Sequence, residues 1–168
     1  MNTLTPINTT EFKNNVSIRF NNILDGFDNY KNFELKGNNI PKATNNIINF
    51  LTEVFELNNN EAYVDLYLNN LNKSDKENLL NICCQYDKET IIKHINLNHN
   101  EPYYKLKDKS LIPFLTRLNT KEVFFVTFYF TKTPLTVWGN YNMTFPCFTD
   151  TDENLNMYKN LAKLHNLV

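Results

Sequence analysis

Cysteine, histidine and tyrosine residues near the C-terminus are where this sequence comes closest to a catalytic site. Cys147 follows a proline, and Tyr141 and His165 lie in the same part of the chain. A cysteine nucleophile needs a base such as histidine within hydrogen-bonding reach. No residue next to Cys147 would activate its thiol. An enzyme or nucleotide-binding regulator with a site around Cys147, His165 and Tyr141 therefore stays open as an alternative, but we expect no catalytic residue.

Spacing argues against a metal centre. His94 and His99 are five positions apart, which places them on different faces of a helix. The segment DTDENLN, which starts at Asp150, resembles the start of a calcium-binding loop. Leu155 stands where such a loop needs glycine, and Leu161 where it needs a carboxylate. We therefore expect no metal and interpret this segment as the start of a helix.

Composition excludes several further classes of ligand. The chain has only three isolated glycines, so it cannot form a glycine-rich phosphate loop, and we expect no cofactor. Seventeen basic and eighteen acidic side chains give a net charge of −1, unlike the strongly basic balance of nucleic-acid-binding proteins. No apolar run could span a membrane or serve as a signal peptide. We expect a cytoplasmic protein that contacts neither nucleic acid nor membrane directly.

A single globular domain, residues 1–168, is expected from the length. Apolar residues recur at helical spacing in several segments that begin with capping residues. Residues 11–35 fit either a helix or a strand, although helix followed by an extended piece is favoured. Amphipathic helices are predicted for residues 41–57, 74–87, 88–95, 110–118 and 151–165.

The stretch VFFVTFYFTKTPLTVWGNYN contains the most apolar part of the chain. Both faces of residues 122–131 are largely apolar, which is typical of a central strand covered on both sides. Residues 135–139 are predicted to return as its hairpin partner. The expected fold class is therefore α+β, with a small mixed or antiparallel sheet packed by several helices. On the return strand Trp138 should be at least half buried, while Tyr141 should be exposed.

Charge is distributed unevenly along the chain. Residues 50–101 contain nine acidic and four basic side chains, whereas residues 102–132 contain six basic and two acidic ones. Such asymmetry can steer a protein toward a charged partner. Acidic and aromatic side chains are therefore the predicted partner-binding residues: Glu61, Tyr63, Asp65, Tyr67, Tyr141, Asp150, Asp152 and Glu153.

In its size, composition and lack of a catalytic motif, the chain resembles the immunity proteins of bacterial polymorphic and contact-dependent toxin systems. The resemblance implies a cytoplasmic antitoxin that neutralises a cognate toxin domain, often a basic nuclease, by direct binding. An acidic surface of this chain would then cover the toxin. An accessory protein of a phage or mobile element, without a toxin partner, is a third hypothesis.

Overall fold

The computed structural model describes residues 3–37, 42–97 and 99–168. Seven strands form one sheet in the order β1-β4-β3-β5-β6-β7-β2, and every pairing is antiparallel. The strands are β1 Thr5–Pro6, β2 Lys31–Lys36, β3 Ala62–Asp65, β4 Tyr103–Leu106, β5 Phe128–Phe130, β6 Leu135–Val137 and β7 Thr144–Thr149. The predicted α+β class is confirmed, with the sheet antiparallel rather than mixed.

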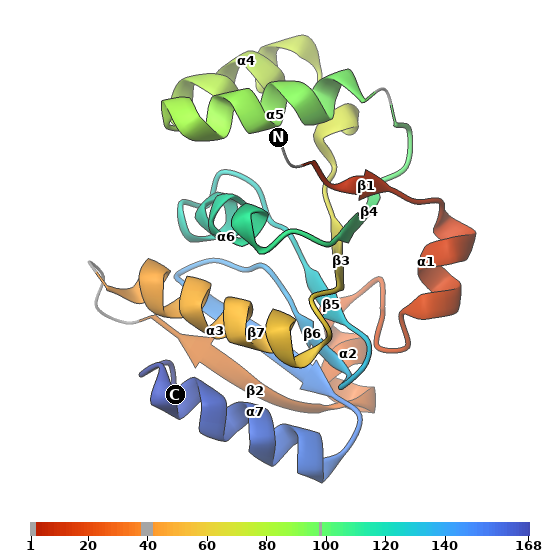
Figure 1. Ribbon diagram of the computed structural model, residues 1–168, viewed down its shortest axis with the longest axis vertical. Coiled ribbons are helices and arrows are strands. Elements are labelled where there is room, and N and C mark those ends of the chain that lie inside the picture. The colour runs from red at the N-terminus through yellow and green to blue at the C-terminus, as the bar shows by residue number, and fades with distance from the viewer. Residues whose placement is uncertain (1–2, 38–41, 98) are drawn as a thin grey trace.

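Helices lie on both faces of this sheet (Figure 1). The α-helices are α1 Thr9–Asn15, α2 Ile23–Asn29, α3 Ala43–Leu57, α4 Lys73–Ile82, α5 Gln85–Asn96, α6 Ile112–Thr120 and α7 Asp152–Leu164, with short 3-10 turns η1 Leu68–Asn70 and η2 Lys109–Leu111. We call the side of α3, α6 and α7 the front face and the side of α1 and α2 the back face. The described part of the chain contains no helix that is long and apolar enough to cross a membrane.

Strand alternation divides the core between the two faces. Val64 and Phe128 pair across β3 and β5 and belong to the large front cluster. Tyr63 and Tyr129 pair one position away and join a smaller back cluster around Phe12 of α1. Successive strand residues point to opposite faces, so this register decides which side chains reach each side.

The predicted central strand is much shorter than expected. β5 is fourth of the seven strands, but it covers only Phe128–Phe130 of the predicted residues 122–131. Just before it, Asn119 bonds both the N–H and the C=O of Val126, and the Thr127 N–H donates to the Asp65 carboxylate. Because side chains occupy these backbone groups, the regular strand begins at Phe128, and Thr127 pairs with β3 only through its C=O, which accepts from the Asp65 N–H. Its predicted hairpin partner is present as β6.

The N-terminal segment contains helix and strand in succession. Residues 11–35, which fitted either structure, fold as the end of α1, then α2, then most of β2. Asparagine side chains cap several helices: Asn8 begins α1, Asn22 begins α2 and Asn72 begins α4. The start predicted for the helix at residues 41–57 lies at position 41, outside the described residues.

Candidate functional site

A groove on the back face is the candidate functional site. Two cavities of about 320 and 430 Å³ share the residues Asn21, Asp65, Tyr67 and Trp138 in their walls. We treat them as one groove. The first cavity, which we call the α1 end, is also lined by Phe12, Lys13, Arg19, Phe20, Tyr103 and Tyr129. The second, the β6 end, is also lined by Phe125, Thr127, Gly139, Asn140 and Tyr141.

The positions of Asp65 and Trp138 follow from strand geometry. Asp65 ends β3 two residues after Tyr63, so both side chains are on the back face. Trp138 follows β6, and its backbone N–H donates to the Pro146 carbonyl at 2.9 Å. Its neighbour Val137 is in the front core, so the indole lies on the back. There it stacks on Phe20, with 5.2 Å between ring centroids.

Asp65 is a buried carboxylate in the wall of the groove. Its side chain accepts hydrogen bonds from the Thr127 backbone N–H at 2.7 Å and from the Tyr129 hydroxyl at 3.2 Å. No ion pair joins it to a lysine or arginine among the described residues. Burial raises the pKa of Asp65 to about 6, although these hydrogen bonds oppose the shift. Burial and then the Asp65 charge also raise the pKa values of Tyr67, Tyr103 and Tyr129.

Replacing Asp65 by asparagine is expected to stabilise the fold at neutral pH. The pKa of Asp65 is higher in the folded chain than its ordinary 3.8, so its contribution to stability declines as pH rises from about 4 through about 6. An asparagine keeps an acceptor for Thr127 and can donate to Tyr129. We expect Asp65→Asn to gain about 1–3 kcal/mol at pH 7.5.

Urea unfolding of both proteins at pH 4 and pH 7.5 checks this expectation. The gain should shrink at pH 4, where Asp65 of the wild type is protonated in the folded state. If the variant is less stable than the wild type at pH 7.5, the charged carboxylate does not lower the free energy of unfolding.

Three of the predicted partner-binding residues meet in the groove. Asp65, Tyr67 and Tyr141 all line it. Tyr67 is 39% exposed and Tyr141 58% exposed, whereas only 7% of Asp65 is exposed. Asp65 is thus not the open surface charge that the sequence suggested, because its strand packs inside the sheet.

The remaining predicted residues lie outside the groove. Tyr63, a predicted partner-binding residue, is buried in the free chain, where it shares the back cluster with Phe12 of α1. Glu61 forms an ion pair with Lys105 at 2.9 Å. The exposed acidic residues at the start of α7 line neither cavity; these are Asp150, Asp152 and Glu153.

The sequence did not predict that several residues of the groove belong to a binding site. Trp138 is partly buried, which confirms its predicted burial, but it is also a wall of the groove. Arg19 and Asn21 reach the site because residues 16–22 connect α1 to α2 across the back face. Only the three-dimensional path of this connection reveals their role. The run of aromatic and amide residues from Trp138 to Tyr141 was the one visible indication.

Comparison with protein-family models, with curated proteins and with solved structures found no match to this chain. The case for the groove consequently rests on its own geometry.

The alternative site around Cys147 is not assembled. Cys147 is fully buried in β7, and burial raises the pKa of its thiol well above the ordinary value. His165 instead contacts Glu53 at 2.8 Å, and Tyr141 packs on Phe125. Among the described residues there is also no cluster of three or more potential metal ligands.

The three cysteines should differ in their reactivity with thiol reagents. The sequence alone predicts that Cys83 is in the core, that Cys84 is in a second core row and that Cys147 is in a loop, where it should react faster than Cys83. The structure confirms that Cys83 is buried, but Cys147 is buried too and Cys84 is exposed. We expect a disulfide reagent to modify Cys84 first in the native protein. Mass spectrometry of the modified peptides measures this order, and early labelling of Cys147 would contradict the burial of β7.

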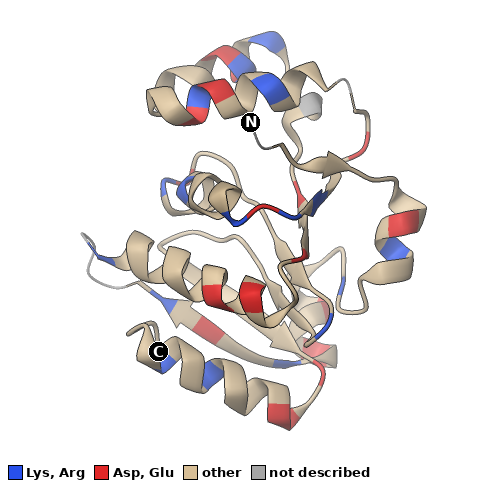
Figure 2. Ribbon diagram, in the orientation of Figure 1, with Lys and Arg blue, Asp and Glu red and all other residues tan. Residues whose placement is uncertain are grey.

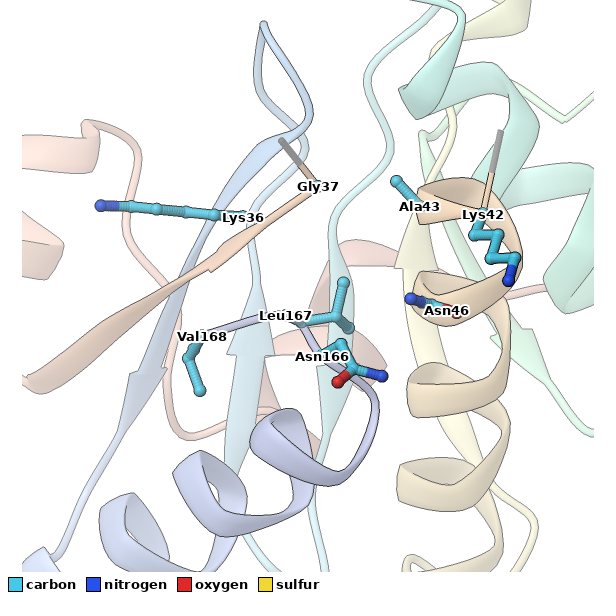
Figure 3. A pocket seen from close by; sticks show the side chains of 8 residues that line it. All are labelled: Lys36, Gly37, Lys42, Ala43, Asn46, Asn166, Leu167 and Val168. Carbon is cyan, nitrogen blue, oxygen red and sulfur yellow. The ribbon is translucent and has the colours of Figure 1, made fainter. Parts of the chain in front are cut away.

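A larger cavity of about 530 Å³ lies near the C-terminus. Figure 3 shows it between the end of β2 and the first turn of α3, with the side chain of Lys36 directed away from α3. Its described lining contains neither an aromatic ring nor an acidic side chain. The groove on the back face offers more chemistry, because charged, amide and aromatic groups converge there.

Proposed function

We propose that this chain is a cytoplasmic protein-binding module, an immunity protein that neutralises a cognate toxin domain by direct contact through the groove. One observation carries the proposal. Tyr67, Trp138 and Tyr141 line a single concave site together with Asp65. Tyrosine and tryptophan are enriched among the residues that dominate binding energy at protein interfaces, and such residues cluster in pockets.

The acidic surface supports the proposal less than the sequence suggested. Three ion pairs join the acidic segment to the basic one: Glu61 to Lys105, Glu56 to Lys109 and Asp87 to Arg117. Figure 2 also shows acidic and basic residues interspersed on α4 and α5. The charge asymmetry along the sequence is thus partly compensated in space. We infer that aromatic contacts, rather than long-range attraction, contribute most of the affinity.

Binding to the product of the neighbouring gene tests the proposal. Tyr67→Ala and Tyr141→Ala should each weaken the complex about tenfold or more, because truncating an anchor residue at an interface costs about 2 kcal/mol or more and each 1.4 kcal/mol is about tenfold in affinity. The matched control is Tyr86→Ala on α5, since Tyr86 is 82% exposed and lines neither cavity of the groove. Titration calorimetry gives the dissociation constants.

Two results would count against this function. If the neighbouring gene's product is not a toxin, or if the wild-type chain does not bind it, the immunity proposal is overturned. If Tyr86→Ala weakens binding as much as the groove variants do, the toxin is held elsewhere.

A further inference from the structure

The two ends of the groove differ in charge. Lys13 and Arg19 line the α1 end. The described lining of the β6 end contains no basic residue, and Asp65 is the one acidic residue in it. The aromatic rings there are Tyr67, Phe125, Trp138 and Tyr141. A carboxylate among several aromatic rings is a setting that attracts a cation, because ring faces are electron-rich and the carboxylate supplies a full negative charge.

Asp65 has no ion-pair partner among the described lysine and arginine side chains. Its carboxylate accepts hydrogen bonds from the Thr127 N–H and the Tyr129 hydroxyl, and the Thr127 side chain and the Asp65 N–H also bond to it. All of these donors are uncharged, so the negative charge of the carboxylate is left without a counter-ion. The amide side chains of Asn21 and Asn140 line the same end and add uncharged acceptors beside it.

We propose that the β6 end of the groove binds an arginine side chain of the partner protein, with its guanidinium paired to Asp65 and held against Tyr67 and Trp138. This inference rests on the proposed function and specifies the group that the partner inserts. Arginine suits the site better than lysine for two reasons. Its planar head stacks on aromatic rings, and its five N–H donors match the carboxylate and amide oxygens together.

Binding should depend on pH through the state of Asp65. Burial raises the pKa of Asp65 to about 6, so the carboxylate is charged at pH 7.5 and increasingly protonated below pH 6. The ionisable groups around it are Tyr67, Tyr103 and Tyr129, whose pKa values are all raised, and Lys13 and Arg19 at the α1 end. The three tyrosines stay neutral between pH 5 and 7.5, because their pKa values are raised further above this range. Affinity for a guanidinium should therefore fall as pH is lowered through about 6.

The single tryptophan reports on this site directly. Trp138 is the only tryptophan of the chain, and it lines the groove. The probe is N-acetyl-arginine-N-methylamide, and its uncharged control is the citrulline analogue, which has nearly the same shape. At pH 7.5 we expect a saturable change in Trp138 fluorescence emission when the arginine probe is added. The dissociation constant of the citrulline analogue should be about tenfold larger or more.

Two variants complete the test. Asp65→Asn should weaken arginine binding about tenfold or more and remove its dependence on pH between 5 and 7.5. Asp75→Asn removes an exposed carboxylate on α4 and should change neither. Equal binding of both probes, no saturable response to arginine, or full binding by Asp65→Asn would each overturn the inference.

The outcomes also separate this inference from the proposed function. If the toxin binds tightly and Asp65→Asn binds it equally well, the immunity function stands and the arginine site is refuted. If the arginine probe binds but the toxin does not, the site stands and the immunity function is refuted.

Discussion

Replacing Arg117 by alanine is expected to lower the free energy of unfolding by about 3–5 kcal/mol. Arg117 of α6 donates two hydrogen bonds to Asp87 of α5, from Nε at 2.8 Å and from a terminal nitrogen at 2.6 Å. Only 3% of the Asp87 side chain is exposed. Removing the guanidinium would leave a buried charge without its counter-ion, which is among the most costly single changes in a protein core.

Chemical denaturation measures this loss, and a double variant is its control. Asp87→Leu together with Arg117→Met removes both charges and keeps apolar volume, so it should regain most of the stability. A loss below about 1 kcal/mol for Arg117→Ala would mean that solvent already screens the pair.

The pair should also act at low pH. Burial alone would raise the pKa of Asp87, but hydrogen bonds from Arg117 and Cys84, together with the charges of Arg117 and Lys121, outweigh it and hold the pKa below the ordinary 3.8. Its stabilising contribution is therefore complete above about pH 4 and is lost as pH falls further. In Arg117→Ala this acid-sensitive contribution should disappear.

Replacing Gly139 by alanine is the second change with a large expected effect, a loss of about 2–4 kcal/mol. A Cβ at this position would lie 2.6 Å from the Asn119 side-chain oxygen and 2.7 Å from the Val126 carbonyl. These two groups belong to the buried pair of hydrogen bonds that joins Asn119 to Val126. The added methyl group must break this pair or move the turn that carries Asn140 and Tyr141.

A double-mutant cycle with Asn119→Ala tests the mechanism. Removing the carboxamide of Asn119 opens space beside Gly139. The double variant should therefore lose less stability in urea unfolding than the sum of the losses of the two single variants. Strict additivity would show that the methyl group acts elsewhere. Gly139→Ala should also weaken binding in the groove, because it displaces the wall of the β6 end.

The sequence predicted the fold class better than it predicted the site. Helical periodicity predicted α3, α6 and α7, because the apolar residues of each helix recur on one face and that face packs into the large front cluster. It overestimated the central strand, because apolar content cannot reveal that Asn119 and Asp65 take over the backbone bonds of Val126 and Thr127.

The groove depends on contacts between distant segments. Asp65 and Tyr67 are two positions apart in the sequence, and both line the groove. The sequence could not show that Phe12 of α1 joins Tyr63 in the back cluster, or that Phe20 stacks on Trp138 across most of the chain length. Such pairings arise from the strand order and from the path of residues 16–22, which no local pattern encodes.

The strand order has a consequence for biosynthesis. The first two strands of the chain form the two outer edges of the sheet, and β2 pairs only with β7, which ends at Thr149. Phe12 and Phe20 are therefore synthesised well before Tyr129 and Trp138, against which they pack, so this wall of the groove can close only after those later residues have been made. A chain that ends before Tyr141 would lack part of the β6 end, so the groove can form only after β5, β6 and the residues up to Tyr141 have been synthesised.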